Sequence, residues 1–581
     1  MNALLPFIIS GIATGSVYGM AGTGLVLSYK TSGIFNFGYG ALATAAVYVF
    51  YWAHIQHHWD WQYAFLLSVF VVGPLMGFGM ERLARLLAPQ GTAMKIVGTL
   101  GLVLLVQGLG SAKYGADTIQ IPQYLPAGTD HFRLGGLNID YAQVTITGIA
   151  CLAVAALYIL FRYARIGLAM QAVVDDPDLL STKGTDPARV RRVAWVISST
   201  FAALSGVLLA PMVGLDPIGL TFLVVEAFGA AAIGLFSSIP LTFVGGLVIG
   251  ILSSVSVKYV LDVSWLSGLP PSLPFIVLFI VLLVAPRRKL VSISSIRVRP
   301  PLEWRAPIPV RVVTGMVVLA GLLLVPSVVG TKLSFFSTAL TEVIIFLSLG
   351  LLVRTSGQVS LCQSVFAAVG AVAFAQLAGQ HHLPWFVALL LAALITVPVG
   401  AIVAVPAIRL SGLFLALATL GFGIMVQQLF YPLNIMFTSY GNGRPMPRPS
   451  FAQTDRAFYY LILVIVVVTA ALMIAIQRSR LGRMLLGLAD SPTAVSVMGL
   501  STNVTRVIVF CASAFFAAIA GILYGSSINI VTGGEQYYTA FNSLILVAIL
   551  SIAPFAATPW YALFAGLTAV IPAYIPGRNT P

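Results

Sequence analysis

The chain has 581 residues, of which 59% are hydrophobic and 8% charged, and its mean hydropathy is +0.99. Because a soluble domain carries about 25% charged residues, this composition excludes a water-soluble fold and predicts that lipid is the solvent. The net charge of +14 would suggest nucleic-acid binding in a soluble protein, but here the basic residues flank apolar stretches on alternate sides, which is typical of a membrane protein and argues against a nucleic-acid partner.

The apolar stretches predict an all-α polytopic membrane protein with about 18 transmembrane helices, because crossing a bilayer core takes about 20 apolar residues in a helix. Nine stretches precede the basic segment that begins at Arg287, at residues 4–29, 35–53, 62–80, 93–112, 142–161, 193–212, 220–236, 240–257 and 273–286. Nine more follow it, at residues 310–327, 335–353, 360–378, 384–405, 411–431, 457–476, 507–525, 538–553 and 558–575. The shorter stretches are compatible with half-helices.

The positive-inside rule predicts how the chain is oriented. When the spans alternate in direction, most of the basic residues, Lys30, Arg287 and Arg354 among them, fall on one side, which this rule identifies as the cytoplasm. The N-terminus is then extracytoplasmic, and the start of the chain lacks the basic region of a cleavable signal peptide. The three cysteines lie in apolar runs without metal-ligand or disulfide spacing, so no metal site is expected.

The sequence repeats one plan twice. Shifted by 315 residues, the segment 165–208 aligns with 480–523 without a gap and with 13 identities in 44 positions. A shift of 320 aligns 98–109 with 418–429, and a shift of 324 aligns Lys30-Thr31-Ser32-Gly33 with Arg354-Thr355-Ser356-Gly357. Both copies run in the same direction through the membrane, so the pattern predicts two parallel halves related by a pseudo-two-fold axis near the membrane normal.

The repeat predicts three parts of the chain. Residues 1–286 form a first half of about nine helices, and residues 287–309, rich in Arg and Pro, form a cytoplasmic linker. Residues 310–581 form a second half of about nine helices, which carries an extra leading helix and has no counterpart of the last helix of the first half.

Each half has a polar loop, 162–192 or 477–506, that the sequence marks as a short capped helix. Asp176 before Pro177 is typical of an N-cap and first helical residue, and Gly184 of a left-handed stop, with Ser491, Pro492 and Gly499 equally spaced in the second copy. An ordinary ordered loop explains one such helix, but two equal ones favour docking onto a two-fold symmetric partner. The residues predicted to form these docking loops are Gly167, Asp175, Asp176, Pro177, Gly184, Arg191, Gly482, Asp490, Ser491, Pro492, Gly499 and Arg506.

Polar and glycine-rich positions within the apolar stretches are candidates for a transport path, because irregular backbone at membrane depth is tolerated where it is buried or lines a cavity. A helix N-terminus near residues 36–40 could face a substrate carboxylate, while close packing by small residues is the alternative. Thr99 with Gln107, and Thr419 with Gln427, are spaced so that each pair shares a helix face, which fits either a polar lining or interhelical hydrogen bonds. The candidate path residues are Asn36, Gly38, Gly40, Thr99, Gln107, Ser360, Gln363, Ser364, Thr419 and Gln427.

Two carboxylates, Glu226 and Glu342, lie inside apolar stretches, where an ionisable residue is costly and suggests function. Neither has a counterpart in the other half. Glu226 could pair with Lys258 or lie near the end of a short span.

The whole chain resembles the permeases of branched-chain amino acid ABC importers, with two different permease subunits fused. The segment TSGIFNFGYGALATAAVY (31–48) is similar to the segment after the first span of one subunit. RTSGQVSLCQSVFAAVGA (354–371) and RLSGLFLALATLGFG (409–423) are similar to segments of the other. The chain departs from the family where Tyr39-Gly40 replaces the usual His-Gly, and where LSIAPFAATP (550–559) replaces a glycine-rich turn.

The resemblance implies an ATP-driven permease that forms the translocation path for branched-chain or related hydrophobic amino acids in a bacterial plasma membrane. It implies two ATP-binding subunits on the cytoplasmic loops and a solute-binding protein outside. The chain contains no GxxxxGK[ST] pattern, so ATP is expected on the partners, and no catalytic residue or cofactor is expected here.

Other functions remain open at this stage. The same importer type could carry urea, amides or another small polar solute. An ion-coupled secondary transporter would be expected to show inverted repeats and paired intramembrane acids. A purely structural membrane protein would not need duplicated capped loops.

Overall fold

The computed structural model describes residues 4–115, 118–125, 132–134, 137–216, 219–260, 263, 266–286, 307–410, 412–437, 443–499, 501–553 and 558–574. The chain forms two compact units, Met1–Val298 and Arg299–Pro581. The predicted linker 287–309 lies almost entirely outside the described residues, so its role stays a prediction.

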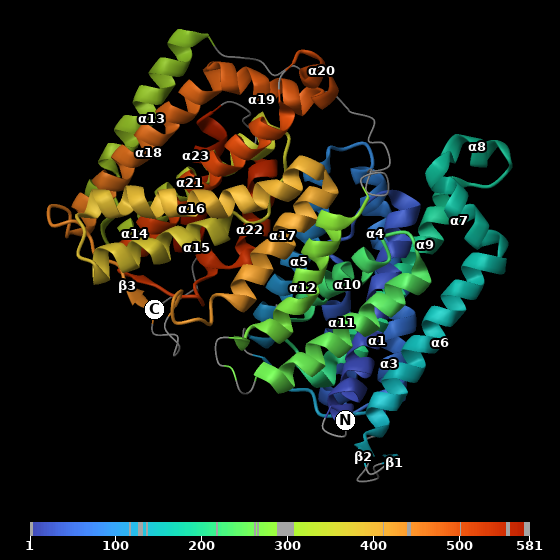
Figure 1. Cartoon of the computed structure of the whole chain (residues 1–581). Coiled ribbons are helices and arrows are strands. Elements are labelled where there is room, and N and C mark those ends of the chain that lie inside the picture. Colours follow the sequence, from blue (N-terminus) through green and yellow to red (C-terminus); the bar gives the residue numbers. More distant parts are fainter. Residues whose placement is uncertain are drawn as a thin grey trace. The chain divides into compact units, whose positions relative to one another are not determined.

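Unit 1 is built from helices and one small hairpin (Figure 1). Its first elements are α1 (Leu5–Ser32), α2 (Tyr39–Tyr51) with η1 (Trp52–Gln56), α3 (Trp61–Leu66), η2 (Leu67–Val72), α4 (Gly73–Leu87) and α5 (Thr92–Tyr114). The antiparallel strands β1 (Phe132–Leu134) and β2 (Leu137–Ile139) follow, with Arg133 opposite Asn138. The unit continues through α6 (Tyr141–Tyr163), α7 (Arg165–Asp175), α8 (Pro177–Thr182), α9 (Pro187–Val213), α10 (Gly219–Ile233), α11 (Ile239–Val260) and α12 (Leu269–Val284).

Unit 2 has the same plan after an extra first helix. Its elements are α13 (Ile308–Val328), η5 (Gly330–Lys332), α14 (Leu333–Gly350) with η6 (Leu351–Thr355), α15 (Gln363–Phe374) with η7 (Ala375–Gln380), α16 (Trp385–Arg409) and α17 (Leu413–Leu429). They continue through β3 (Arg444–Pro445), α18 (Asp455–Arg478), α19 (Arg480–Asp490), α20 (Pro492–Val497), α21 (Thr502–Ile528) and β4 (Ile530–Val531), which pairs antiparallel with β3. The last elements are η8 (Gln536–Tyr538), α22 (Ala540–Ile552), α23 (Trp560–Leu567) and η9 (Thr568–Tyr574).

All 18 predicted stretches are helical, which confirms an all-α polytopic membrane protein, but they differ in length. Among the described residues, 11 helices are long and apolar enough to cross a membrane, and five more are apolar but shorter. The helices α10 and α22 have 15 and 13 residues, so they are about 22 and 20 Å long, against a bilayer core of about 30 Å. The stretches 220–236 and 538–553 are therefore half-helices and not full spans.

Glycine lets the central helices of each unit approach closely, as is typical of helix packing in lipid. In unit 1, α9 crosses α2 where a Cβ on Gly206 would lie 2.7 Å from the Ala43 carbonyl oxygen. In unit 2, α21 crosses α15 where a Cβ on Gly521 would overlap the Ala367 carbonyl. The pairs Gly206/Gly521 and Ala43/Ala367 are equivalent in the repeat, so the structure repeats the contact as well as the sequence.

The repeat also includes a turn that the sequence analysis overlooked. Residues 56–58 and 380–382 both read Gln-His-His, at the shift of 324 that relates the two Thr-Ser-Gly sites. Each turn follows a π-helix, η1 or η7, and each second histidine has a left-handed backbone, with φ +55° at His58 and +49° at His382. All six residues are exposed. Comparing the halves at one fixed shift would have found the motif.

The glycine contact predicts that two Gly→Ala substitutions change the stability of the protein in different directions. Gly521→Ala should lower the free energy of unfolding of the purified protein by about 1–3 kcal/mol, because the new methyl group overlaps backbone atoms that cannot move aside. Gly315→Ala, on α13 with open space around it, should be neutral or stabilising by up to about 1 kcal/mol. Thermal unfolding in detergent measures both, and equal shifts would contradict the packing argument.

Candidate functional site

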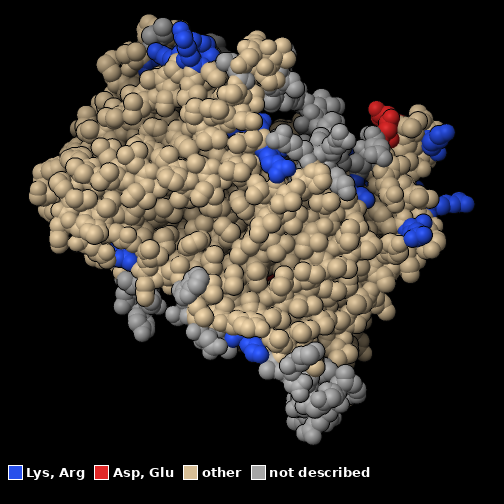
Figure 2. Space-filling model, viewed as in Figure 1, with Lys and Arg blue, Asp and Glu red and all other residues tan. Residues whose placement is uncertain are grey.

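Two short helices match the capped loops that the sequence predicts. In unit 1, α8 begins at Pro177 after Asp176, whose Oδ1 accepts hydrogen bonds from the backbone N–H groups of Asp178 (3.0 Å) and Leu179 (2.9 Å). Gly184 then turns the chain at φ +80°, where a side chain would be strained. Figure 1 shows α7 and α8 at the opposite end of unit 1 from β1 and β2, and Figure 2 shows basic side chains near them.

Unit 2 repeats this geometry. Here α20 begins at Pro492 after Ser491, whose hydroxyl accepts a hydrogen bond from the Ala494 N–H (3.3 Å), and Gly499 turns the chain at φ +78°. Both helices have six residues, so the caps and the length agree in the two copies. Their docking role stays a prediction.

A second repeated pair of glycines shapes the corner before each capped helix. A Cβ on Gly167 would overlap the Leu160 carbonyl, and one on Gly482 would overlap the Gln477 carbonyl. The chain therefore folds back tightly between α6 and α7, and between α18 and α19, because neither corner has room for a side chain.

The other predicted loop residues lie at helix ends. Arg506 Nη1 donates hydrogen bonds to the carbonyls of Ala407 (2.9 Å) and Ile408 (3.1 Å) at the end of α16, where a cation suits the helix dipole. Its counterpart Arg191 is partly exposed on α9. The two predicted aspartates, Asp175 and Asp490, are the last residues of α7 and α19.

The cations of the repeated tetrapeptides hold the ends of the half-helices. Lys30 Nζ donates a hydrogen bond to the Ser237 carbonyl (2.9 Å), just after α10. Arg354 Nη2 donates to the carbonyls of Leu550 (2.8 Å) and Ala553 (3.0 Å) at the end of α22. The Arg354 contact places positive charge at a helix C-terminus, where the carbonyl groups lack partners within the helix. The Lys30 contact holds the turn between α10 and α11.

In unit 1, α2 begins within the spanning region. A Cβ on its N-cap residue, Gly38, would lie 2.7 Å from the carbonyl oxygen of Thr99, which is about 10 Å along α5 from Thr92. The preceding Asn36 side chain is fully buried, and its Nδ2 and Oδ1 have no hydrogen-bond partner among the described residues. Leaving a buried amide unpaired costs about 1–3 kcal/mol, so this one needs an explanation.

In unit 2, the equivalent segment is held by hydrogen bonds. The Leu361 N–H donates to Thr419 Oγ1 (2.9 Å), and Gln363 Nε2 donates to Ser513 Oγ (2.9 Å). The Ser513 hydroxyl lies 3.0 Å from that of Ser348. These side chains join α14, α15, α17 and α21 inside the unit, so here the interhelical hydrogen bonds left open by the sequence are present.

The first turns of α15 and α22 bind each other. The Ser364 N–H donates to Ser543 Oγ (3.0 Å), and Asn542 Nδ2 donates to Ser364 Oγ (3.2 Å). The Ala540 N–H at the start of α22 donates to Gln427 Oε1 (2.7 Å). The predicted Thr419 and Gln427 pair therefore supports the beginnings of two different helices.

Unit 1 also brings its two matching helices together. A Cβ on Gly40 would overlap the backbone of Thr221, so the first turns of α2 and α10 touch. The Thr99 hydroxyl donates within its own helix, to the Ile96 carbonyl (2.9 Å), and Gln107 is partly exposed. Since the N-terminal end of a helix carries partial positive charge, the α2–α10 junction favours a carboxylate.

The Ser360 side chain, at the position equivalent to Asn36, lies 3.4 Å from Cys362 Sγ and is fully buried. The two halves thus differ at this position: the unit 1 amide is unpaired and the unit 2 hydroxyl has a neighbour.

The two intramembrane carboxylates have tyrosine neighbours. The Tyr18 side chain on α1 interacts with the Glu226 carboxylate on α10. No ion pair between Glu226 and Lys258 is seen among the described residues. Glu342 lies near Tyr537. At the shift of 324, Tyr18 and Glu342 occupy equivalent positions on α1 and α14, a relation that the sequence analysis missed.

The partners of the candidate residues were not predicted from the sequence. These are Ser348, Ser513, Asn542 and Ser543, which lie in apolar stretches without a distinctive pattern. Within the described residues, no group of three or more His, Cys, Asp or Glu side chains could hold a metal ion.

Comparison with known proteins gives the family of both halves. The family described as "Branched-chain amino acid transport system / permease component" matches residues 7–286 and again residues 331–573. These two matches cover most of the chain, and they agree with the internal repeat.

Individual permease proteins are similar to parts of the chain. It is 26% identical over 266 residues to the high-affinity branched-chain amino acid transport system permease protein LivH of Salmonella typhimurium, covering 43% of this chain and 85% of the relative. It is 25% identical over 255 residues to BraD of Pseudomonas aeruginosa, covering 42% and 83%. It is 30% identical over 241 residues to LivM of Escherichia coli, covering 36% and 56%.

The support of α22 by Gln427 can be tested against a neighbouring glutamine. Gln427→Met should lower the free energy of unfolding by about 1–3 kcal/mol, because it leaves the Ala540 N–H without its acceptor. Gln428→Met is the control, since no hydrogen bond of the Gln428 side chain is seen among the described residues. Thermal unfolding in detergent compares them, and a loss of stability as large for the control would argue against the capping role.

Proposed function

This chain belongs to the family of branched-chain amino acid transport system permease components, with two permease domains in one chain, and we propose that it forms the translocation path of an ATP-driven importer for branched-chain amino acids. The relatives LivH, BraD and LivM carry this substrate class in their names. The chain is a multi-pass membrane protein, and we place it in a bacterial plasma membrane with its N-terminus outside.

The junction of α2 and α10 carries the proposal for the substrate site. The first turns of both helices meet there, and the buried Asn36 amide beside them is unpaired. An amino acid would offer its carboxylate to the helix N-termini and a hydrogen-bond partner to the amide. Phe37 and Phe228, whose ring centroids are 5.3 Å apart, add an apolar surface suited to a branched aliphatic side chain.

The two units take different parts in this proposal. In unit 2, the beginning of the equivalent helix α15 is bound to neighbouring helices, because the Leu361 N–H donates to Thr419, Gln363 to Ser513 and the Ser364 N–H to Ser543. In unit 1, the Asn36 amide has no hydrogen-bond partner among the described residues, so it is available to a ligand. Unit 2 thus uses these polar groups to hold its helices together, whereas unit 1 supplies the proposed contact with the substrate.

Transport needs energy from partner proteins, because the chain contains no phosphate-binding GxxxxGK[ST] loop. The six-residue helices α8 and α20 are the proposed docking points for two ATP-binding subunits, one on each unit. A solute-binding protein would deliver the amino acid from the other side. Alternating access would follow from movement of these subunits, transmitted through the tight corners at Gly167 and Gly482.

The substrate site is tested with equivalent positions of the two units. Asn36→Ala should reduce leucine, isoleucine and valine uptake at least about tenfold, because a buried hydrogen bond to the ligand is lost. Asn36→Asp should reduce it further, since its carboxylate repels that of the substrate. Ser360→Ala is the matched control and should change uptake little.

Uptake is measured in proteoliposomes with the ATP-binding subunits and the binding protein, with urea and acetamide as alternative solutes. Wild-type uptake by Asn36→Ala would contradict the proposed site while leaving the permease function intact. Transport of urea in place of the amino acids would contradict the proposed substrate class.

The docking helices are tested through their left-handed glycines. Gly184→Val and Gly499→Val should each reduce co-purification of the ATP-binding subunits and ATP-driven uptake at least about tenfold, because valine disfavours the φ near +80° that ends each helix. Gly91→Val is the control, since Gly91 has φ −64° and open space around it. Uptake that survives loss of the ATP-binding subunits but collapses with the ion gradient would contradict the ATP-driven mechanism.

A further inference from the structure

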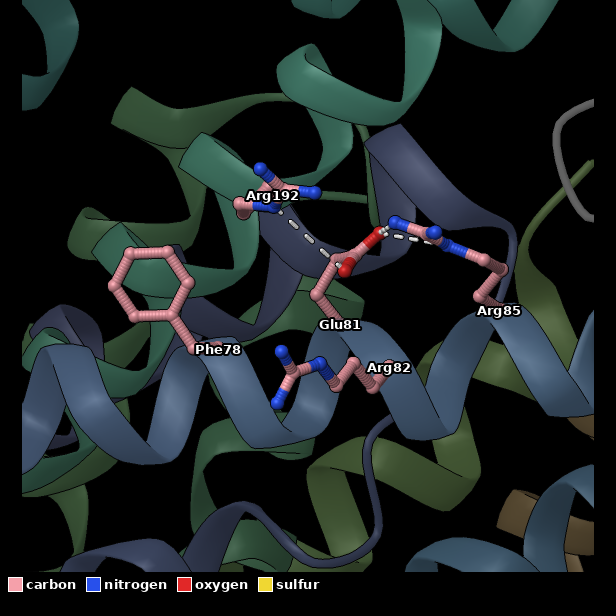
Figure 3. Close-up of a pocket in the computed structure, with 5 residues that line it drawn as sticks. All are labelled: Phe78, Glu81, Arg82, Arg85 and Arg192. Carbon is pink, nitrogen blue, oxygen red and sulfur yellow. Dashed lines mark hydrogen bonds and ion pairs between the residues drawn. The ribbon is translucent and has the colours of Figure 1, made fainter.

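A basic cavity of about 350 Å³ lies between α4 and α9 in unit 1 (Figure 3). It is lined by Phe78, Glu81, Arg82, Arg85 and Arg192. Its volume is in the range of small-molecule sites.

The cavity carries more positive than negative charge. Glu81 is 3% exposed, and its Oε1 lies 2.5 Å from Arg85 Nη2, while its Oε2 lies 3.9 Å from Arg192 Nε. Arg82 has no ion pair among the described residues. One carboxylate therefore faces three guanidinium groups, which leaves a formal charge of +2, and Figure 3 shows Arg82 and Arg192 on the same side of Glu81 as Phe78.

The fold does not require this cluster, because unit 2 packs the same helix pair without it. A Cβ on Gly77 would lie 2.9 Å from the Trp195 carbonyl oxygen, and one on Gly400 would lie 3.1 Å from the equivalent Phe510 carbonyl oxygen. Since Gly77 and Gly400 pack against equivalent carbonyl groups, they occupy equivalent positions of α4 and α16. The positions equivalent to Glu81, Arg82, Arg85 and Arg192 then hold Ala404, Val405, Ile408 and Val507.

An exposed apolar strip leads along η2 and α4 to the cavity. Val71, Leu75 and Phe78 are 48%, 63% and 46% exposed, and they follow one another at helical spacing toward Arg82. Arg192 lies in the second turn of α9, which follows the capped helix α8. The cavity is therefore at the end of the spanning helices, where an apolar wall meets the basic loop side.

We propose that this cavity binds the phosphate group of an anionic phospholipid. The guanidinium groups of Arg82 and Arg192, with Arg85, would hold the phosphate, since arginine binds phosphate oxygens through paired N–H donors. The acyl chains would lie along the strip from Phe78 to Val71. The lipid would thus bridge α4 and the beginning of α9. The proposal does not depend on which solute is transported.

Lipid retention by the purified full-length chain tests the proposal. Native mass spectrometry counts bound phosphatidylglycerol and phosphatidylcholine with identical acyl chains. The wild type should retain phosphatidylglycerol preferentially, and Arg82→Gln with Arg192→Gln should weaken this retention at least about tenfold. These two substitutions keep the Glu81–Arg85 ion pair. Arg82→Lys with Arg192→Lys should restore part of the retention.

Arg478→Gln with Arg480→Gln is the matched control, because it removes the same charge from exposed positions of unit 2. It should retain phosphatidylglycerol like the wild type. Should the double variant at Arg82 and Arg192 not fold, Arg82→Gln alone is used, since it breaks no ion pair.

Three results would overturn the proposal. The first is equal phosphatidylglycerol retention by the wild type and the Arg82 variants. The second is displacement of the lipid by inorganic phosphate at millimolar concentration, which would identify free phosphate as the ligand. The third is unchanged lipid retention together with loss of the ATP-binding subunits, which would make the cavity a protein contact.

Discussion

The structure depends on the need to satisfy backbone polar groups wherever a helix begins or ends inside the membrane. Each unit contains two such helices, α2 and α10 or α15 and α22, which are broken within the spanning region. Lys30 donates to a carbonyl group of the turn after α10, and Arg354 donates to carbonyl groups at the end of α22. In unit 2, their beginnings are held by side chains of α17. The repeated basic tetrapeptide is therefore a structural support for the half-helices.

Duplication preserved this frame while the two halves diverged in polarity. The pair Gly206 and Gly521 keeps the same helix crossing, yet the neighbouring segments differ: Asn36 is unpaired in unit 1, whereas unit 2 has a network through Gln363. The cavity at Glu81 likewise has only apolar counterparts in unit 2. A substrate is not two-fold symmetric, so a transport path gains nothing from two identical walls. The differences between the halves are therefore the best guide to function.

Local features of the fold could be predicted well. Asp176, Pro177 and Gly184 each act through their own backbone, so their order alone predicts a helix with both ends, and the structure has that helix. The segments of helix were also predictable from apolar runs. The lengths of these helices were harder to predict from the sequence, because α10 and α22 end at contacts with other helices. Of the two alternatives for Glu226, no ion pair with Lys258 is seen among the described residues, where Glu226 interacts with Tyr18 on a distant helix.

By itself, the sequence determined that this is a membrane protein of two homologous halves with a capped helix in each, because composition, repeat and caps are local or periodic properties. The tertiary structure decided which polar side chains are occupied and which are not. Ser364 and Gln427 support helix beginnings, whereas Asn36 has no hydrogen-bond partner in the described part of the chain. Similar polar residues in similar apolar stretches can take either role. The difference depends on which atoms of distant helices lie within hydrogen-bond distance, and only the packing of those helices sets that.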